Sequence, residues 1–170
     1  MLPDHEEGSS DNYDVFLSSL RSYRSSVLKP FYLSAAPVCT SGNGTISRAT
    51  LALVDFIFIR FYNSAKCSLG TPGFPQSLKE WYQQTIPSPH LPFPKVLLGG
   101  LSFDNGNTGY VSAETFRDAI QAARRPKLDC WWNEHKFGGV MLWDGPRGLK
   151  NEVTDGVDYL TYVKDVLAKD

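Results

Sequence analysis

The chain has 170 residues and an even charge balance, with 17 Lys and Arg against 18 Asp and Glu and a formal net charge of -1. Hydrophobic residues make up 42% of the sequence and charged residues 21%, which is typical of one globular domain with a sizeable core. The lack of a basic excess argues against a nucleic-acid partner, and no apolar run is long enough to suggest a membrane span. The three histidines share no ligand-like spacing and no C-x-x-C motif occurs, so we expect neither a metal nor another cofactor.

The hydrophobic pattern predicts helices and strands in alternation. Tyr13, Phe16 and Leu17 open a series of apolar residues at three- and four-residue spacings, which indicates a helix over residues 9–27. Further helices are expected over residues 76–86, 112–125 and 156–168, with Ser112 as the N-cap of the third of the four. Short buried strands are expected over residues 31–36, 55–62, 95–101 and 138–143.

Short apolar strands that alternate with helices are typical of a parallel α/β architecture. Four such units are half of an eight-unit TIM barrel, which takes about 250 residues. The pattern is therefore compatible with a small open α/β sheet or with a partial (β/α)8 barrel. In either case we expect a single domain over residues 1–170.

Five segments, in this order, resemble a known family. They are DHEEGS at residues 4–9, YLSAAPVC at 32–39, FIRFYN at 58–63, VLLGGL at 96–101 and GGVMLW at 138–143. Together they resemble the class III chitinases of plants and fungi, in glycoside hydrolase family 18. The resemblance implies the C-terminal half of a TIM (β/α)8 barrel of about four parallel strands. It also implies an endochitinase that cleaves β-1,4 links in chitin or chito-oligosaccharides with retention, using the acetamide of the substrate as nucleophile.

The resemblance assigns the acid chemistry to the start of the chain. Glu6 would be the general acid, and Asp4 would orient the acetamide and stabilise the oxazolinium intermediate. Because side chains two residues apart on a strand point to the same side, this pair suits the motif. A shift of one residue would pair Glu7 with His5, which fits less well. The alternative to a site is a pair of solvated acids in a frayed chain end.

The later motifs supply the other candidate site residues. By resemblance, Tyr62 would hydrogen-bond the acetamide carbonyl, and Trp143 would form the apolar floor of the subsite that holds the distorted sugar. Asn63 and Arg60 complete the substrate-binding set, although Asn63 could simply cap a strand and Tyr62 could be a core residue. Arg60 stands where the family has glutamine, and a guanidinium in the cleft would favour the ionised form of the nearby acid.

Cys39 and Cys67 fall where the family has a disulfide, which requires an oxidising compartment. Cys130 is then the odd thiol. The family implies secretion, but the first residues of the chain carry no signal peptide.

The strand units that would precede residue 4 in the family do not occur in this sequence, which would leave open sheet edges that invite self-association. We therefore expect weak or no activity from these 170 residues alone. The alternative functions are a non-catalytic carbohydrate-binding or inhibitor-like protein, or an inactive relic fragment.

Overall fold

The structure is a computed structural model that describes residues 11–26, 28–29, 31–40, 46–84, 94–125 and 136–169. Asp4, Glu6 and Cys130 lie outside these residues, as do His5 and Glu7. Four strands form one sheet in the order β1-β2-β3-β4, and every neighbouring pair is parallel. The strands are β1 (Ser34–Ala35), β2 (Phe56–Arg60), β3 (Lys95–Leu101) and β4 (Phe137–Trp143). The predicted partial (β/α)8 barrel is confirmed.

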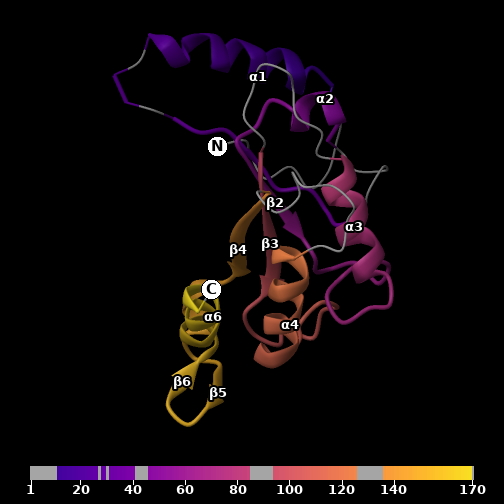
Figure 1. Cartoon of the computed structure of the whole chain (residues 1–170), viewed down its shortest axis with the longest axis vertical. Coiled ribbons are helices and arrows are strands. Elements are labelled where there is room, and N and C mark those ends of the chain that lie inside the picture. The colour runs from indigo at the N-terminus through magenta and orange to yellow at the C-terminus, as the bar shows by residue number, and fades with distance from the viewer. Residues whose placement is uncertain are drawn as a thin grey trace.

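Helices connect the strands and lie mainly on one side of the sheet, where α3 and α4 run beside it in Figure 1. The helical segments are α1 (Tyr13–Ser22), η1 (Tyr23–Ser25), α2 (Arg48–Leu51), α3 (Phe74–Gln84), α4 (Ala113–Arg124), α5 (Gly145–Gly148) and α6 (Tyr159–Ala168). A small hairpin, β5 (Glu152–Thr154) and β6 (Val157–Asp158), precedes α6. The four predicted helices occur as α1, α3, α4 and α6, with α1 and α6 shorter than predicted and α3 beginning two residues earlier. The short helices α2 and α5 and the hairpin were not predicted.

The two faces of the sheet differ in burial. On the face toward the helices, Ile57 and Ile59 are fully buried and Leu98 is 1% exposed. Gly100 lies on this face, where a Cβ would stand 2.6 Å from the ring of Phe116 on α4, so glycine permits the close approach of that helix. Alternate residues point to the other face, which we call the second face.

The predicted strand over residues 31–36 is shortened to Ser34–Ala35 because Asp55 replaces part of the ladder. The backbone N–H of Leu33 donates to Asp55 Oδ2 at 2.8 Å, and Arg21 and Arg24 form ion pairs with the same carboxylate at 3.4 and 3.2 Å. The amino end of β2 is thereby fastened to the segment around α1.

Side-chain hydrogen bonds cap the first turns of α4 and α6. Ser112 caps α4 by accepting from Thr115 N, as predicted. Asp158 caps α6, and the hydrogen bonds donated by Thr161 lower the pKa of its carboxyl group. Arg124 donates to the carbonyl of Leu167 at 2.7 Å and so joins the ends of α4 and α6, where a cation is favoured by the helix dipole.

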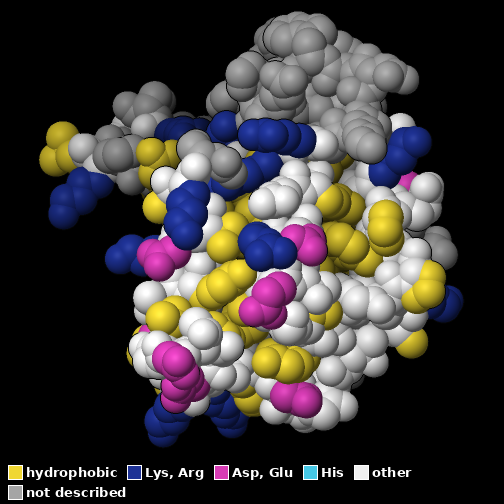
Figure 2. Space-filling view, turned by 60° about the horizontal axis from the view of Figure 1, so that its bottom comes forward, with side chains coloured by type: hydrophobic (Ala, Val, Ile, Leu, Met, Phe, Trp, Pro, Cys, Tyr) yellow, Lys and Arg dark blue, Asp and Glu magenta, His cyan; other side chains and the backbone are white. Residues whose placement is uncertain are grey.

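The surface carries both signs of charge. Basic and acidic side chains occur on the face shown in Figure 2, with hydrophobic side chains between them. Within the described part of the chain, no helix is both long and apolar enough to cross a membrane.

Candidate functional site

The sheet register places the predicted site residues of β2 and β4 at the carboxyl end of the sheet. Arg60 pairs with Gly99, and two residues later Leu101 pairs with Trp143. Tyr62 stands two residues after Arg60, just past the end of β2, so continuing the register would place it level with Leu101 and Trp143. We call these three residues, at the carboxyl ends of three adjacent strands, the row. Their alternation with the helix-facing residues puts this row on the second face.

This row joins a buried phenol to an exposed indole. Tyr62 is 8% exposed and Trp143 is 52% exposed. Since neighbouring strands lie about 4.8 Å apart, the backbones of these two residues are separated by roughly 10 Å, with Leu101 between them. An exposed aromatic plate beside a buried polar ring is a surface on which the apolar face of a sugar can stack.

The turn after Tyr62 is held by the loop that follows β3. Asn63 adopts a left-handed conformation with φ 60°, and its N–H donates to the carbonyl of Thr108 at 2.8 Å. Gly109 comes directly after Thr108 in the chain, and a Cβ at Gly109 would lie 2.6 Å from the Cα of Tyr62. The Asn63 side chain is exposed at this turn.

Arg60 lies one row below Tyr62, on the same face, and is only 7% exposed. Its partner on β3 is Gly99, where a Cβ would clash with the backbone oxygen of Ile59 and stand 2.9 Å from Met141 Cε. A buried guanidinium is screened less by water than a surface one, so its charge acts over a longer distance within the site.

The backbone beside Trp143 is bonded to residues that the sequence analysis did not single out. Ser102 N donates to the Trp143 carbonyl at 2.9 Å, and Ser102 Oγ donates to the Asp144 carbonyl at 2.6 Å. Asn151 Nδ2 in turn donates to the carbonyl of Ser102 at 2.8 Å. The sequence signal that could have identified Ser102 is its place as a small polar residue directly after the apolar run of β3.

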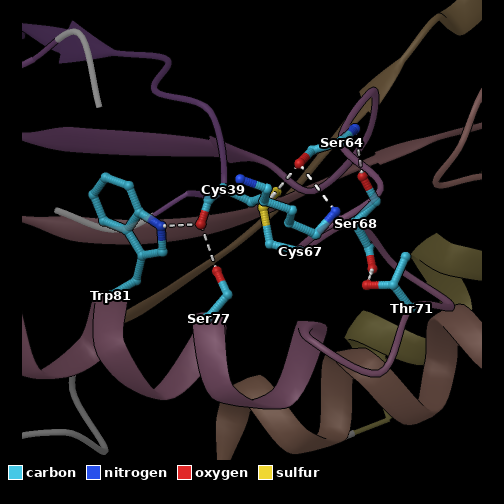
Figure 3. The surroundings of a disulfide bond; sticks show 8 residues. Cys39, Ser64, Cys67, Ser68, Thr71, Ser77 and Trp81 are labelled. Atoms are coloured by element: carbon cyan, nitrogen blue, oxygen red, sulfur yellow. Dashed lines mark hydrogen bonds between the residues drawn. A yellow bond between two sulfur atoms is a disulfide. The ribbon is translucent and has the colours of Figure 1, made fainter. Parts of the chain in front are cut away.

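The predicted disulfide between Cys39 and Cys67 is confirmed, with the sulfur atoms 2.09 Å apart. It joins the loop after β1 to the loop after β2. As Figure 3 shows, Ser77 Oγ and Trp81 Nε1 of α3 both donate to the Cys39 carbonyl, at 2.5 and 3.0 Å. A cavity of about 520 Å³ opens beside the disulfide, with Lys66 in its lining, but it includes neither Tyr62 nor Trp143.

The structure thus groups Arg60, Tyr62 and Trp143 on one face, places Asn63 at the adjoining turn, and sets the disulfide apart from them. Asp4 and Glu6 lie outside the described residues, so their roles stay predictions. In the ranges that the structure describes, no group of three or more His, Cys, Asp or Glu residues could hold a metal ion.

No protein-family model matches the chain. Among curated proteins, the chain is 28% identical over 172 residues to Endochitinase Ziz m 1.0101 of Ziziphus mauritiana, covering 94% of this chain and 49% of that protein. It is 31% identical over 176 residues to Endochitinase A1 of Aspergillus fumigatus, covering 96% of this chain and 20% of that protein. The chain therefore spans half or less of the length of these relatives.

Solved structures show the same likeness. The xylanase and alpha-amylase inhibitor protein XAIP-II of Scadoxus multiflorus matches with a TM-score of 0.68 at 25% identity, over 97% of this chain and 54% of that one. The ordered motifs, the four-stranded parallel sheet and these relatives agree with one another. The chain belongs to glycoside hydrolase family 18, in which it corresponds to half of a class III chitinase-type barrel.

Proposed function

We propose that this chain carries the C-terminal half of a chitinase-type site for retaining, substrate-assisted hydrolysis of β-1,4-linked N-acetylglucosamine polymers, within a single domain over residues 1–170. The observation that supports it is that Tyr62 and Trp143 stand at the carboxyl ends of β2 and β4, on either side of β3 in the parallel sheet. Active sites of β/α barrels are built at that end of the sheet.

The proposed chemistry needs one acid and a well-placed acetamide. Glu6 donates a proton to the leaving glycosidic oxygen while the acetamide carbonyl oxygen attacks the anomeric carbon, which gives a cyclic oxazolinium ion. Asp4 stabilises that cation, and the Tyr62 hydroxyl donates a hydrogen bond to the acetamide carbonyl oxygen and keeps its proton. Water, deprotonated by Glu6, then opens the ring with overall retention. Trp143 supplies the apolar floor, and Asn63 and Arg60 line the substrate path.

The direct test is hydrolysis of a fluorogenic chito-oligosaccharide by the purified chain, by Glu6→Gln and by Glu7→Gln. The proposal expects that any turnover by the chain, which should be weak, disappears in Glu6→Gln and persists in Glu7→Gln, because residues two apart on a strand point to the same side and Glu6 would then stand beside Asp4. Loss of turnover in Glu7→Gln alone would move the acid by one position. Turnover that survives in both variants would refute the assignment of the acid to this segment.

Replacing Arg60 by glutamine is expected to move the basic limb of the pH–rate profile to higher pH. A buried positive charge favours the ionised form of a nearby carboxyl group, whereas a general acid must start protonated. Removing the charge therefore extends activity toward neutral pH. The measurement is kcat/KM against pH for the chain, Arg60→Gln and the charge-keeping control Arg60→Lys. A basic limb that moves equally in both variants, or in neither, would contradict this role of the charge.

A non-catalytic carbohydrate-binding or inhibitor-like protein is the second candidate. The likeness to XAIP-II, whose name describes an inhibitor, favours it. Tight binding of a chito-oligosaccharide that needs Trp143 but is never followed by hydrolysis would support this candidate over the enzyme. A chain that folds cooperatively but neither binds nor hydrolyses the sugar would fit an inactive relic.

The surroundings proposed for the chain are extracellular, and the Cys39–Cys67 disulfide supports an oxidising compartment. We also propose self-association through the sheet edges at β1 and β4, since Tyr32 and Trp143 are 57% and 52% exposed on these two strands or beside them. Light scattering of the purified chain tests this proposal, and a mass of one chain at high concentration would argue against it.

A further inference from the structure

Ser102 is fully buried and directly follows β3. It forms hydrogen bonds with two successive backbone carbonyls, those of Trp143 and Asp144. Its N–H donates to the carbonyl of Trp143 at 2.9 Å, and its hydroxyl donates to the carbonyl of Asp144 at 2.6 Å. The residue that directly follows β3 thus continues the hydrogen bonding to β4 and adds a side-chain bond to the residue after Trp143.

A second layer holds Ser102 itself. Asn151 Nδ2 donates to the Ser102 carbonyl at 2.8 Å and lies 3.1 Å from Tyr110 Oη. The backbone carbonyl of Asn151 accepts from Tyr159 N at 2.8 Å, which ties this layer to the start of α6. On the remaining side, a Cβ at Gly148 would stand 2.7 Å from Ser102 Cβ, so α5 packs directly against the serine.

Trp143 has no comparable enclosure of its own, because it is 52% exposed. The direction in which its indole leaves the sheet therefore depends on the backbone of residues 143 and 144. Asp144 is also held through its side chain, which caps α5 by accepting a hydrogen bond from Arg147 N at 3.0 Å. The hydrogen bonds to the backbone of residues 143 and 144 therefore help to fix the position of the indole.

We propose that Ser102 is a positioning residue that sets the orientation of Trp143 for sugar binding. The inference rests on the proposed function in one respect, namely that the Trp143 ring contacts the sugar. Ser102 itself lies behind the sheet end, under α5, and acts through the Trp143–Asp144 backbone. A displaced indole of Trp143 stacks on less of the sugar, but the ring is still present. Sugar binding is therefore weakened and not abolished.

The test compares Ser102→Ala with Ser77→Ala in the full chain. Both serines are buried, and each donates its hydroxyl to a backbone carbonyl, at 2.6 and 2.5 Å. The two variants should therefore lose similar thermal stability, since each loses one buried hydrogen bond. We expect Ser102→Ala to weaken chitotetraose binding roughly tenfold by calorimetry, the equivalent of about one such bond, while Ser77→Ala leaves the Kd unchanged.

A readout independent of the ligand is the indole N–H resonance of Trp143, assigned by its disappearance in Trp143→Phe. It should shift in Ser102→Ala and stay in place in Ser77→Ala. An unchanged resonance and Kd in Ser102→Ala, with binding that Trp143→Ala does weaken, would overturn the inference alone. Unchanged binding in Trp143→Ala would instead overturn the proposed function. If Ser102→Ala does not fold, Asn151→Ala removes the supporting bond from the outer side and is expected to show the same two effects.

Discussion

Replacing Gly109 by alanine is expected to lower the free energy of unfolding by roughly 2 to 5 kcal/mol. Gly109 has φ 111°, a region that residues with a Cβ rarely adopt, and the added Cβ would stand 2.6 Å from the Cα of Tyr62. The strained dihedral angle accounts for about 1 to 2 kcal/mol of this loss and the overpacking for about 1 to 3 kcal/mol. Urea denaturation followed by circular dichroism measures it.

Gly106→Ala is the matched control for this loss. Gly106 lies in the same loop and also has positive φ, at 79°, but nothing stands within 4 Å of its Cβ position. We expect it to lose only the dihedral part, about 1 to 2 kcal/mol. Equal losses in the two variants would contradict the close approach of Gly109 to Tyr62. Because that approach also holds the turn at Asn63, Gly109→Ala should weaken sugar binding where Gly106→Ala does not.

The strands were predictable where burial on both faces keeps every residue apolar. The expected strand at 95–101 coincides with β3, since its flanks are polar or proline-rich and its interior is uniformly apolar. The strand at 31–36 was predicted too long because a residue far along the chain intervenes. Asp55 takes the N–H of Leu33 and so removes a donor from the ladder, an effect that no local pattern contains.

The segment between β4 and α6 was predicted least well, although its turn signals were present. Asp144 followed by a Gly-Pro pair is a helix start, and Asp155 with Gly156 is a turn. The helix expected from residue 156 begins at Tyr159 because Val157–Asp158 pairs with Glu152–Thr154 in a hairpin, and Asp158 serves as the cap.

The candidate site also has one part that the sequence could predict and one part that it could not. That Tyr62 and Trp143 share a row follows from motifs at the ends of parallel strands, so the sequence carried this information. The hold of Ser102 and Asn151 on the Trp143 backbone depends on contacts between residues more than 40 positions apart, and only the folded chain brings them together.

Removal of the disulfide is expected to cost about 3.6 kcal/mol of stability, from the chain entropy of a loop closed over a sequence separation of 28 residues. The link joins the loops after β1 and β2, and β1 contributes only two residues to the sheet. The Cys39 carbonyl keeps its donors Ser77 and Trp81 when the side chain changes, so the loss reports mainly on the cross-link.

Cys39→Ser, Cys67→Ser and the double variant together identify the cause of this loss. Each single substitution already opens the loop, so the double variant should be about as unstable as either single one, rather than twice as unstable. Urea denaturation of all three, with the wild type measured with and without reductant, provides the comparison. Additive losses would show that each cysteine stabilises the chain through its own packing, and β1 would then stay in place without the link. Non-additive losses would mean that the cross-link holds the β1 edge of the sheet beside the strand that leads to Tyr62.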